Sequence, residues 1–362
     1  MKTTARNLPL GFEGQRLPYA GLAFSIAFLN FLTIGLYKPY GLTRMRRALY
    51  NRITVGGEAL AYVGDAKGQG RVTFYPSLAL LFLLVGPGVL QFYVDFSAAI
   101  AIGVVQLGML VVFAHYLAYR ARQYELMSVE WRGQPFYLTG SAATYMWAAF
   151  GLQVANLLTL GFITPWRRVK LAELQYQPLH HGNVAIKAAF TSKPLWLPYL
   201  LGWLAALVGT AVLGYFFWQS AGGPAWQLYH GGPVNPAMAA EVQGIGAGVP
   251  GGADPIAMAE LGTWLHLLFG IFIYYPLWRL LRLACFAVYE AAYWRQLAAA
   301  LSCGPLGLRF DGSVMGLLML NAVSYVANFF TANLTRPFTT YQKARYFVGA
   351  LTVTNAQAAL RS

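Results

Sequence analysis

Charged residues are scarce in this chain. Only 10% of its 362 residues are Asp, Glu, Lys or Arg, whereas 57% are hydrophobic. Typical soluble domains contain about 25% charged residues. The hydrophobic residues also form runs that are longer than one globular core requires. The composition therefore excludes a soluble protein, and we expect lipid to cover much of the surface.

Cysteine and the common catalytic motifs are also scarce. The two cysteines, Cys285 and Cys303, provide neither a disulfide framework nor a metal-ligand cluster. The nucleophile elbow, the zinc-protease motif and the phosphate-binding loop are absent from the sequence. His180 and His181 have no third ligand at metal-binding spacing, and we expect them in a solvated turn. We therefore predict no catalytic residue, metal or cofactor, and a membrane enzyme is only the third hypothesis.

Lys and Arg avoid three long windows, residues 72–119, 133–166 and 194–278. The first and third windows contain the hydrophobic runs 78–94, 98–119, 195–218 and 261–278, each long enough to cross a bilayer as a helix. Basic residues favour the cytoplasmic side, so we place the Arg-rich segments there and the glycine-rich loop 221–259 outside. The net charge of +14 then reflects membrane topology and does not indicate nucleic-acid binding.

One sequence unit occurs three times. Its copies are NFLTIGLYKPY at residues 30–40, NLLTLGFITPW at 156–166 and NFFTANLTRPF at 328–338. Each copy has Asn, Thr three residues later and Pro nine residues after the Asn. Because Pro disfavours continuation of a helix, one helix should end before it and a second should begin there. We expect residues 1–135 and 136–305 to be repeat units with following helix pairs, and 306–362 to be a partial unit.

Three groups of residues in these copies are candidates for function. The polar residues that share a helical face are Asn30, Thr33, Asn156, Thr159, Asn328 and Thr331. The helix-breaking residues are Pro39, Pro165 and Pro337. The basic residues suited to anionic lipid headgroups, on helices that we expect along the membrane surface, are Arg44, Arg46, Arg47, Arg167, Arg168 and Lys170.

The polar Asn and Thr residues allow two interpretations. They could line a solute path formed by the three copies, or they could form hydrogen bonds between helices or cap the turn before the Pro. Ionisable residues within apolar runs are also candidates for function, and here these are His115, His266 and Glu290. Each of these three also lies near an expected membrane interface, which is a simpler explanation.

The basic stretches are followed by strand-like segments at residues 52–64 and 130–140, with a hairpin turn expected at Gly56 and Gly57. The sequence therefore predicts an all-α polytopic membrane protein with four transmembrane helices and three repeated Asn/Thr segments. Interfacial amphipathic helices and short cytoplasmic β hairpins complete the expected fold.

Whether the Asn/Thr segments cross the membrane is open. If each crosses once, the chain has seven crossings and the matching basic clusters fall on opposite sides. If each enters and leaves on the cytoplasmic side, every basic cluster is cytoplasmic, as the charge distribution favours. Residues 19–37 are nevertheless long enough to cross. We slightly favour segments that do not cross.

The combined pattern resembles a known family. It consists of F-x-G, an apolar run ending in L-T-x-G, a Pro followed by an aromatic residue, a basic helix and a G-x-x-x-x-Y-x-G strand. Residues 12–64 and 136–182 contain these strings. They resemble the YjgN-like family of bacterial inner-membrane proteins of unknown function. The resemblance implies a multi-pass protein of the bacterial cytoplasmic membrane, without a known substrate or catalytic residue.

Two functions are consistent with these observations. The first is a transporter or channel-like protein with an Asn/Thr-lined path, because repeats with Pro-broken apolar segments often surround a binding site. The second is a lipid-interacting or scaffold protein whose basic helices bind anionic headgroups. Membrane lipids are the expected partners in either case.

Overall fold

The computed structural model describes residues 8–14, 16–90, 93–223, 255–304, 306–331 and 333–354. The chain forms two units, the first from Met1–Trp196 with Glu290–Ser362 and the second from Leu197–Tyr289. Most of the glycine-rich segment 221–259 lies outside the described residues.

An antiparallel sheet of eleven short strands organises the first unit. The strands are β1 (Leu8–Phe12), β2 (Ile53–Val55), β3 (Glu58–Ala59), β4 (Ala61–Tyr62), β5 (Val129–Trp131), β6 (Gln134–Leu138), β7 (Leu179–His181), β8 (Val184–Ala188), β9 (Leu301–Cys303), β10 (Leu306–Phe310) and β11 (Leu351–Thr354). Their order is β3-β2-β1-β11-β10-β9-β8-β7-β6-β5-β4. The edge strands β3 and β4 are separated in sequence only by Leu60. The sheet must therefore curl until its two edges approach each other.

The sheet makes the expectation of an all-α fold wrong. Its strands have only two to five residues, which is too short for a clear alternation of apolar and polar residues. Several neighbours are also remote in sequence, as where Ile186 of β8 lies opposite Cys303 of β9. The expectation of a solvated turn at His180 and His181 is also wrong, because both residues lie in β7.

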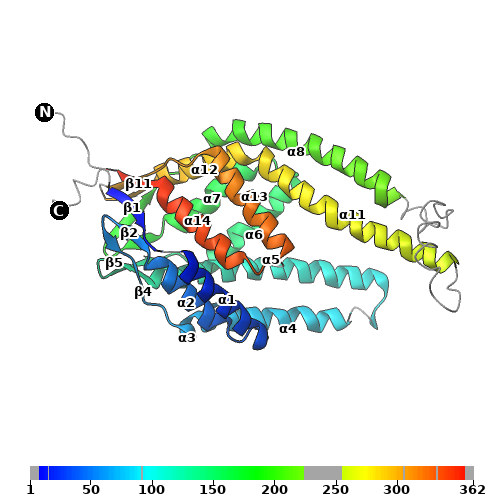
Figure 1. The fold of residues 1–362 in the computed structure, drawn as a ribbon, viewed down its shortest axis with the longest axis horizontal. Helices are drawn as coiled ribbons and strands as arrows, with labels where there is room; N and C mark the ends of the chain where they lie inside the picture. Colours follow the sequence, from blue (N-terminus) through cyan, green and yellow to red (C-terminus); the bar gives the residue numbers. More distant parts are fainter. Residues whose placement is uncertain are drawn as a thin grey trace. The chain divides into compact units, whose positions relative to one another are not determined.

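Three segments of the first unit share one order of elements: strand, helix, turn, helix, strand (Figure 1). Their helices are α1 (Arg16–Leu32) and α2 (Lys38–Tyr50), α6 (Ala142–Leu158) and α7 (Thr164–Tyr176), and α13 (Val314–Phe330) and α14 (Arg336–Ala350). We call these pairs the first, second and third helical hairpins. The strands that flank each hairpin pair with each other, β1 with β2, β6 with β7 and β10 with β11. Each hairpin therefore leaves the sheet and returns to it.

Further helices lie wholly or mostly in the first unit. They are α3 (Ala66–Gln69), the π-helical turn η1 (Gly70–Phe74), α4 (Tyr75–Leu90), α5 (Phe96–Met127) and α12 (Ala287–Ala300). Tyr119 of α5 is 1% exposed and packs on Tyr145 of α6, with ring centroids 4.9 Å apart. Ala291 of α12 belongs to a second buried cluster with Leu317 of α13. The second and third hairpins thus each begin against a helix that precedes them in the chain.

The second unit contains most of α8 (Trp196–Phe217), the turn η4 (Trp218–Gly222) and α11 (Pro255–Cys285). The short helix η3 (Lys193–Leu195) precedes α8. A Cβ atom at Gly202 would lie 2.5 Å from the carbonyl oxygen of Cys285. A Cβ atom at Gly209 would lie 2.5 Å from a methyl carbon of Leu281. These glycines therefore allow the close helix packing that is common in membranes.

Three helical stretches are long and apolar enough to cross a membrane: Phe96–Met127, Lys193–Ser220 and Leu261–Cys285. They contain three of the four runs that the sequence predicts as spans. The fourth run, residues 78–94, contains most of α4, whose 16 residues extend about 24 Å at the helical rise of about 1.5 Å per residue. Residues 91–92 of this run lie outside the described part of the chain. A fourth span is therefore not confirmed.

Candidate functional site

The repeated Asn residues lie at the tip of each helical hairpin, where the first helix ends. The backbone N–H groups of Gly35, Gly161 and Asn333 donate to the carbonyl oxygens of Asn30, Asn156 and Asn328 respectively, each at 2.7 Å. Each donor lies five residues after its acceptor, which is the outer hydrogen bond of a Schellman motif. The donors have left-handed backbones with φ values of 86°, 86° and 68°. Asn replaces Gly in the third hairpin because Asn tolerates this conformation.

The first two tips carry apolar residues where this motif favours glycine. Ile34 and Leu160 occupy the left-handed position just after the helix, with φ values of 49° and 51°. This conformation costs a residue with a Cβ atom about 1–2 kcal/mol. Both side chains project away from the protein, with exposed fractions of 95% for Ile34 and 81% for Leu160. Packing within the described residues therefore does not account for their apolar character.

The Asn side chains differ among the three tips. The hydroxyl of Thr164 donates to Oδ1 of Asn156 at 3.0 Å, and the hydroxyl of Thr335 donates to Oδ1 of Asn328 at 3.1 Å. Oδ1 of Asn30 is buried and has no hydrogen-bond partner among the described residues. The first hairpin thus has an unsatisfied acceptor where the other two are satisfied.

The repeated Thr and Pro residues belong to the same turns. The hydroxyls of Thr33, Thr159 and Thr331 donate to carbonyl oxygens four residues earlier, at distances between 2.7 and 2.9 Å. The second residue of the returning helix in each hairpin is Pro39, Pro165 or Pro337. Among the hydrogen bonds of the described residues, none joins the Asn or Thr side chains of one tip to those of another.

Most of the basic residues predicted to bind headgroups contact other groups of the protein. Arg46 forms an ion pair with Glu125 at 2.9 Å, and Arg168 forms one with Glu290 at 2.7 Å. The remaining contacts are Arg44 with the hydroxyl of Tyr37, Arg47 with the carbonyl oxygen of Gly64, and Lys170 with Glu173. Burial lowers the pKa of Arg167, the sixth residue of the set.

A network of side chains fixes Arg46, which lies on α2 of the first hairpin. Its guanidinium donates to Oε2 of Glu125 at 2.9 Å and to Oε1 of Gln69 at 2.6 Å. The hydroxyl of Tyr50 donates to the other oxygen of Glu125 at 2.9 Å. Burial raises the pKa of Tyr50, and the neighbouring carboxylate adds to this effect. Tyr50 therefore remains a neutral donor, and the Arg46–Glu125 pair carries no net charge.

A cavity of about 630 Å³ brings parts of the first and third hairpins together. Asn30 and Arg46 line it together with Pro337, so it contains residues from all three predicted groups. Lys38 and Arg336, the first residues of α2 and α14, also line it. Asn156 and Thr159 of the second hairpin are not among its lining residues. The structure therefore unites parts of two copies and leaves the second copy apart.

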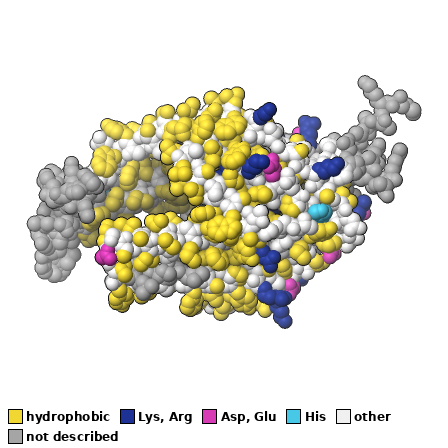
Figure 2. Space-filling view, turned by 180° about the vertical axis from the view of Figure 1, so that it is seen from behind, with side chains coloured by type: hydrophobic (Ala, Val, Ile, Leu, Met, Phe, Trp, Pro, Cys, Tyr) yellow, Lys and Arg dark blue, Asp and Glu magenta, His cyan; other side chains and the backbone are white. Residues whose placement is uncertain are grey.

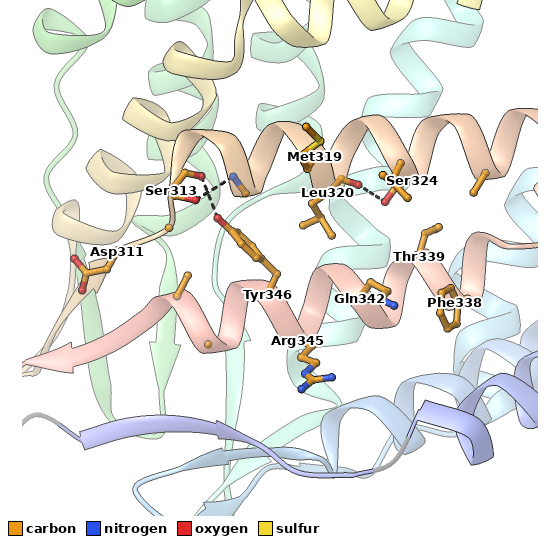
Figure 3. A pocket seen from close by; sticks show the side chains of 16 residues that line it. Asp311, Ser313, Met319, Leu320, Ser324, Phe338, Thr339, Gln342, Arg345 and Tyr346 are labelled. Atoms are coloured by element: carbon orange, nitrogen blue, oxygen red, sulfur yellow. Dashed lines mark hydrogen bonds between the residues drawn. The ribbon is translucent and has the colours of Figure 1, made fainter.

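A larger cavity of about 820 Å³ lies between α13 and α14 (Figure 3). Two hydroxyl groups in its lining form hydrogen bonds within the protein. The hydroxyl of Tyr346 donates to the carbonyl oxygen of Ser313 at 3.1 Å, and the hydroxyl of Ser324 donates to the carbonyl oxygen of Leu320. Figure 3 shows Arg345 pointing away from α13. These two hydroxyls are already engaged within the protein, so they are poorly placed to orient a ligand.

The remaining ionisable candidates are Glu290, His115 and His266. Glu290 is engaged by Arg168, whose guanidinium also lies 4.8 Å from the centre of the Tyr293 ring. His115 and His266 lie within α5 and α11. Among the residues that the structure describes, no three His, Cys, Asp or Glu side chains are placed to hold a metal ion.

The chain matches the model of a family described as bacterial proteins of unknown function (DUF898), over residues 7–361. The chain belongs to this family. It is also similar to the inner membrane protein YjgN of Salmonella typhimurium, with 26% identity over 158 residues. That match covers 42% of this chain and 37% of the relative, so it spans little more than a third of the relative's length. No solved structure matches the chain. The family assignment and the apolar helices identify a YjgN-like membrane protein of unknown function.

Several residues of the site were not predicted from the sequence. Lys38 and Arg336 occupy the position before the repeated Pro, where the second copy has Thr164. Comparison of the three copies at this position could have identified these two residues, because the first and third copies have a cation there and the second does not. Glu125 and Gln69 gave no such signal, since tertiary contacts alone bring them to Arg46.

Proposed function

We propose that this protein is a lipid-interacting protein of the bacterial inner membrane whose helical hairpins enter the cytoplasmic leaflet and leave it on the same side. The observation that carries this proposal is the pair of exposed apolar residues, Ile34 and Leu160, in a backbone conformation that disfavours them. Apolar side chains at this position are favourable if the tips lie in lipid, since burial in an apolar medium stabilises such side chains by about 1.5–3 kcal/mol each.

The length of the hairpins supports insertion to a limited depth. Helix α6 has 17 residues and α5 has 32, so they extend about 25 Å and 48 Å respectively at a rise of about 1.5 Å per residue. The packing of Tyr145 on Tyr119 places the start of α6 near the end of α5 that joins the sheet. From Tyr145, α6 continues for about 20 Å, so the hairpin tip lies about two-thirds of the way along α5 from that end and stops short of its far end, which suits a re-entrant segment.

The distribution of charge supports a cytoplasmic sheet. On the face drawn in Figure 2, Lys and Arg side chains gather over the end of the first unit that carries the sheet, whereas hydrophobic side chains cover its long helices. Basic residues mark the cytoplasmic side of membrane proteins. In this arrangement the three hairpin segments are copies of one β-α-α-β unit, within the repeat units at residues 1–135, 136–305 and 306–362.

A transporter with a path lined by Asn and Thr receives less support. The side chains of Asn156 and Asn328 bond to Thr residues of their own turns, and the repeated Thr hydroxyls bond to the preceding helical turn. Groups used in this way cap helices and are less available to a permeating solute.

The depth of the tips can be measured with fluorescent labels. Single cysteines placed at Ile34 and Leu160, in a background with Cys285→Ser and Cys303→Ser, would carry an environment-sensitive dye in reconstituted vesicles. We expect brominated lipid to quench both labels and aqueous iodide to quench neither. A label at Gly133, in the turn between β5 and β6, serves as the aqueous control. Iodide quenching of the labels at both tips would contradict the proposal.

Labelling from either side of the membrane tests the topology. Lys187 lies on β8 and is exposed. We expect a Lys187→Cys variant to resist an impermeant maleimide in intact cells and to react once the inner membrane is opened. Reaction in cells in which only the outer membrane is permeable would place the sheet outside and refute the arrangement.

A further inference from the structure

The cavity between α13 and α14 extends along most of the third hairpin. Its volume of about 820 Å³ lies within the range of known ligand sites, about 300–1,000 Å³. It follows α13 from Ser313 to Ala327, a length of about 21 Å at a rise of about 1.5 Å per residue. Asp311, directly after β10, lies at one end, and Figure 3 shows Phe338 at the other. The cavity therefore runs from the sheet towards the hairpin tip.

Its walls are apolar and open to the surroundings of the hairpin. Met319, Val323 and Phe338 line the cavity, and each is at least 40% exposed. The hydroxyls of Ser324 and Tyr346 donate to backbone carbonyl oxygens and are not free to bind a ligand. The hairpin lies among acyl chains in the arrangement proposed above, so a hydrocarbon chain is the ligand that suits these walls.

Positive charge surrounds the sheet end of this cavity. Arg345 lines it and is exposed, and Figure 3 shows its side chain directed away from α13, which places the guanidinium at the rim. Arg295 of α12 donates to the carbonyl oxygen of Gly312 at 3.1 Å, and within the described part of the chain no ion pair joins either Arg to an acid. Asp311, the only acid among the described lining residues, pairs with Arg309 at 2.7 Å. The sheet end therefore favours an anionic group.

The second hairpin provides an internal comparison. The cavity at its base has a volume of about 350 Å³ and reaches along α6 only to Tyr145. When the copies are aligned on the repeated Asn, Gly316 and Gly349 correspond to Thr144 and Gln177. Both of these larger residues line the smaller cavity. The third copy thus lacks two side chains that occupy the base of the second, which agrees with its larger cavity.

We infer that the cavity between α13 and α14 binds one acyl chain of an anionic phospholipid of the cytoplasmic leaflet, with its phosphate at Arg345. The lipid then has the orientation of its leaflet, because the cations lie at the sheet end and the apolar walls extend towards the bilayer centre. Half of a hydrocarbon core of about 30 Å is about 15 Å, so an acyl chain can follow most of the cavity. This inference rests on the proposed insertion of the hairpins.

The physical basis of recognition is packing and charge. Within a bilayer an acyl chain gains no hydrophobic stabilisation by moving from other chains to the protein, so van der Waals contacts must hold it. The cations at the rim then select an anionic headgroup. A single site of this kind differs from general attraction to anionic membranes, because it predicts one lipid per chain that a change of cavity shape removes.

Native mass spectrometry of the full chain in detergent tests the charge requirement. The protein would be titrated with phosphatidylglycerol, and with phosphatidylcholine as the zwitterionic comparison. We expect one phosphatidylglycerol to bind about tenfold more tightly than phosphatidylcholine, and Arg345→Gln to remove this preference. Lys187→Gln removes an exposed positive charge from β8 and should leave the preference unchanged. Equal binding of the two lipids, or equal effects of the two substitutions, would overturn the inference.

Enlarged side chains in the lining test the shape requirement. We expect Val323→Trp and Gly349→Leu each to weaken binding of phosphatidylglycerol about tenfold or more, since both fill the space for the chain. A Cβ atom at Gly349 has open space around it, so the fold should persist, as the unfolding temperature can verify. Gly151 of α6 also has open space, and Gly151→Leu is the matched control that should bind as the wild type does. Undiminished binding by both lining variants would overturn the inference.

Photo-crosslinking tests the orientation of the lipid. Phosphatidylglycerol with a diazirine at the end of its acyl chain should label Ala327 or Phe338. With the diazirine beside the ester, it should label Gly316 or Gly349. The reverse pattern would refute the orientation, and labelling confined to α8 and α11 would refute the site.

The tip labels at Ile34 and Leu160 distinguish failure of this inference from failure of the proposed function. Quenching of both labels by brominated lipid, together with binding that is insensitive to every cavity variant, would reject the cavity and retain the insertion. Iodide quenching of both labels would reject the insertion, and with it the access of lipid to this cavity.

Discussion

At the scale of single residues, the three Asn residues provide an internal comparison. Asn156 and Asn328 each accept a hydrogen bond from a Thr hydroxyl, whereas Oδ1 of Asn30 accepts none among the described residues. We expect Asn156→Ala and Asn328→Ala to destabilise the fold by about 1 kcal/mol each, the usual value of such a bond. Asn30→Ala should cost less or stabilise the fold. Thermal unfolding in detergent measures the difference, and equal losses at all three positions would contradict the assignment of the bonds.

The left-handed tip residues should show stability and membrane insertion changing in opposite directions. Ile34→Gly relieves a backbone cost of about 1 kcal/mol and removes a side chain that is 95% exposed. We therefore expect a higher unfolding temperature in detergent. A dye attached near the same tip should also move toward water. A lower unfolding temperature would indicate that Ile34 packs on the protein itself.

At the scale of elements, the packing of α8 on α11 depends on two glycines. A Cβ atom at Gly202 would meet the backbone oxygen of Cys285 at 2.5 Å, and backbone cannot yield cheaply. We expect Gly202→Ala to destabilise the protein by about 1–3 kcal/mol, the usual cost of overpacking. Gly214 of the same helix has open space around it, so Gly214→Ala is the matched control. It should be neutral or stabilise the helix by up to about 1 kcal/mol. Similar effects at both positions would refute this close packing.

At the scale of the whole molecule, the sheet joins the two ends of the chain. Val353 of β11 lies between Leu8 of β1 and Leu308 of β10, and it is 4% exposed. Val353→Ala should cost about 1.5 kcal/mol through the loss of two buried methyl groups. Val353→Pro also removes a backbone donor from an interior strand, so we expect a loss larger by at least about 1 kcal/mol. Unfolding of both variants in detergent measures this difference, and equal losses would argue against the pairing.

Local sequence was sufficient to predict several features. The repeated Pro indicated where one helix ends and the next begins, because Pro lacks an N–H group and restricts its neighbour. Runs of apolar residues without Lys or Arg indicated the three long apolar helices, since a bilayer requires continuous apolar length. The motifs around Phe12 and Phe136 were sufficient to recognise the family.

The tertiary structure alone decided the sheet and the cavity. Strands of two to five residues have little periodicity, and pairings such as β1 with β11 join residues that are remote in sequence. The partners of Arg46 illustrate the same limit, because Gln69 and Glu125 reach it only through the packing of α2 on the elements around it. The positions of Lys and Arg along the chain can indicate which side of the membrane a segment faces. Whether a given cation is neutralised, as Arg46 is by Glu125, depends on which side chains the fold brings within hydrogen-bonding distance.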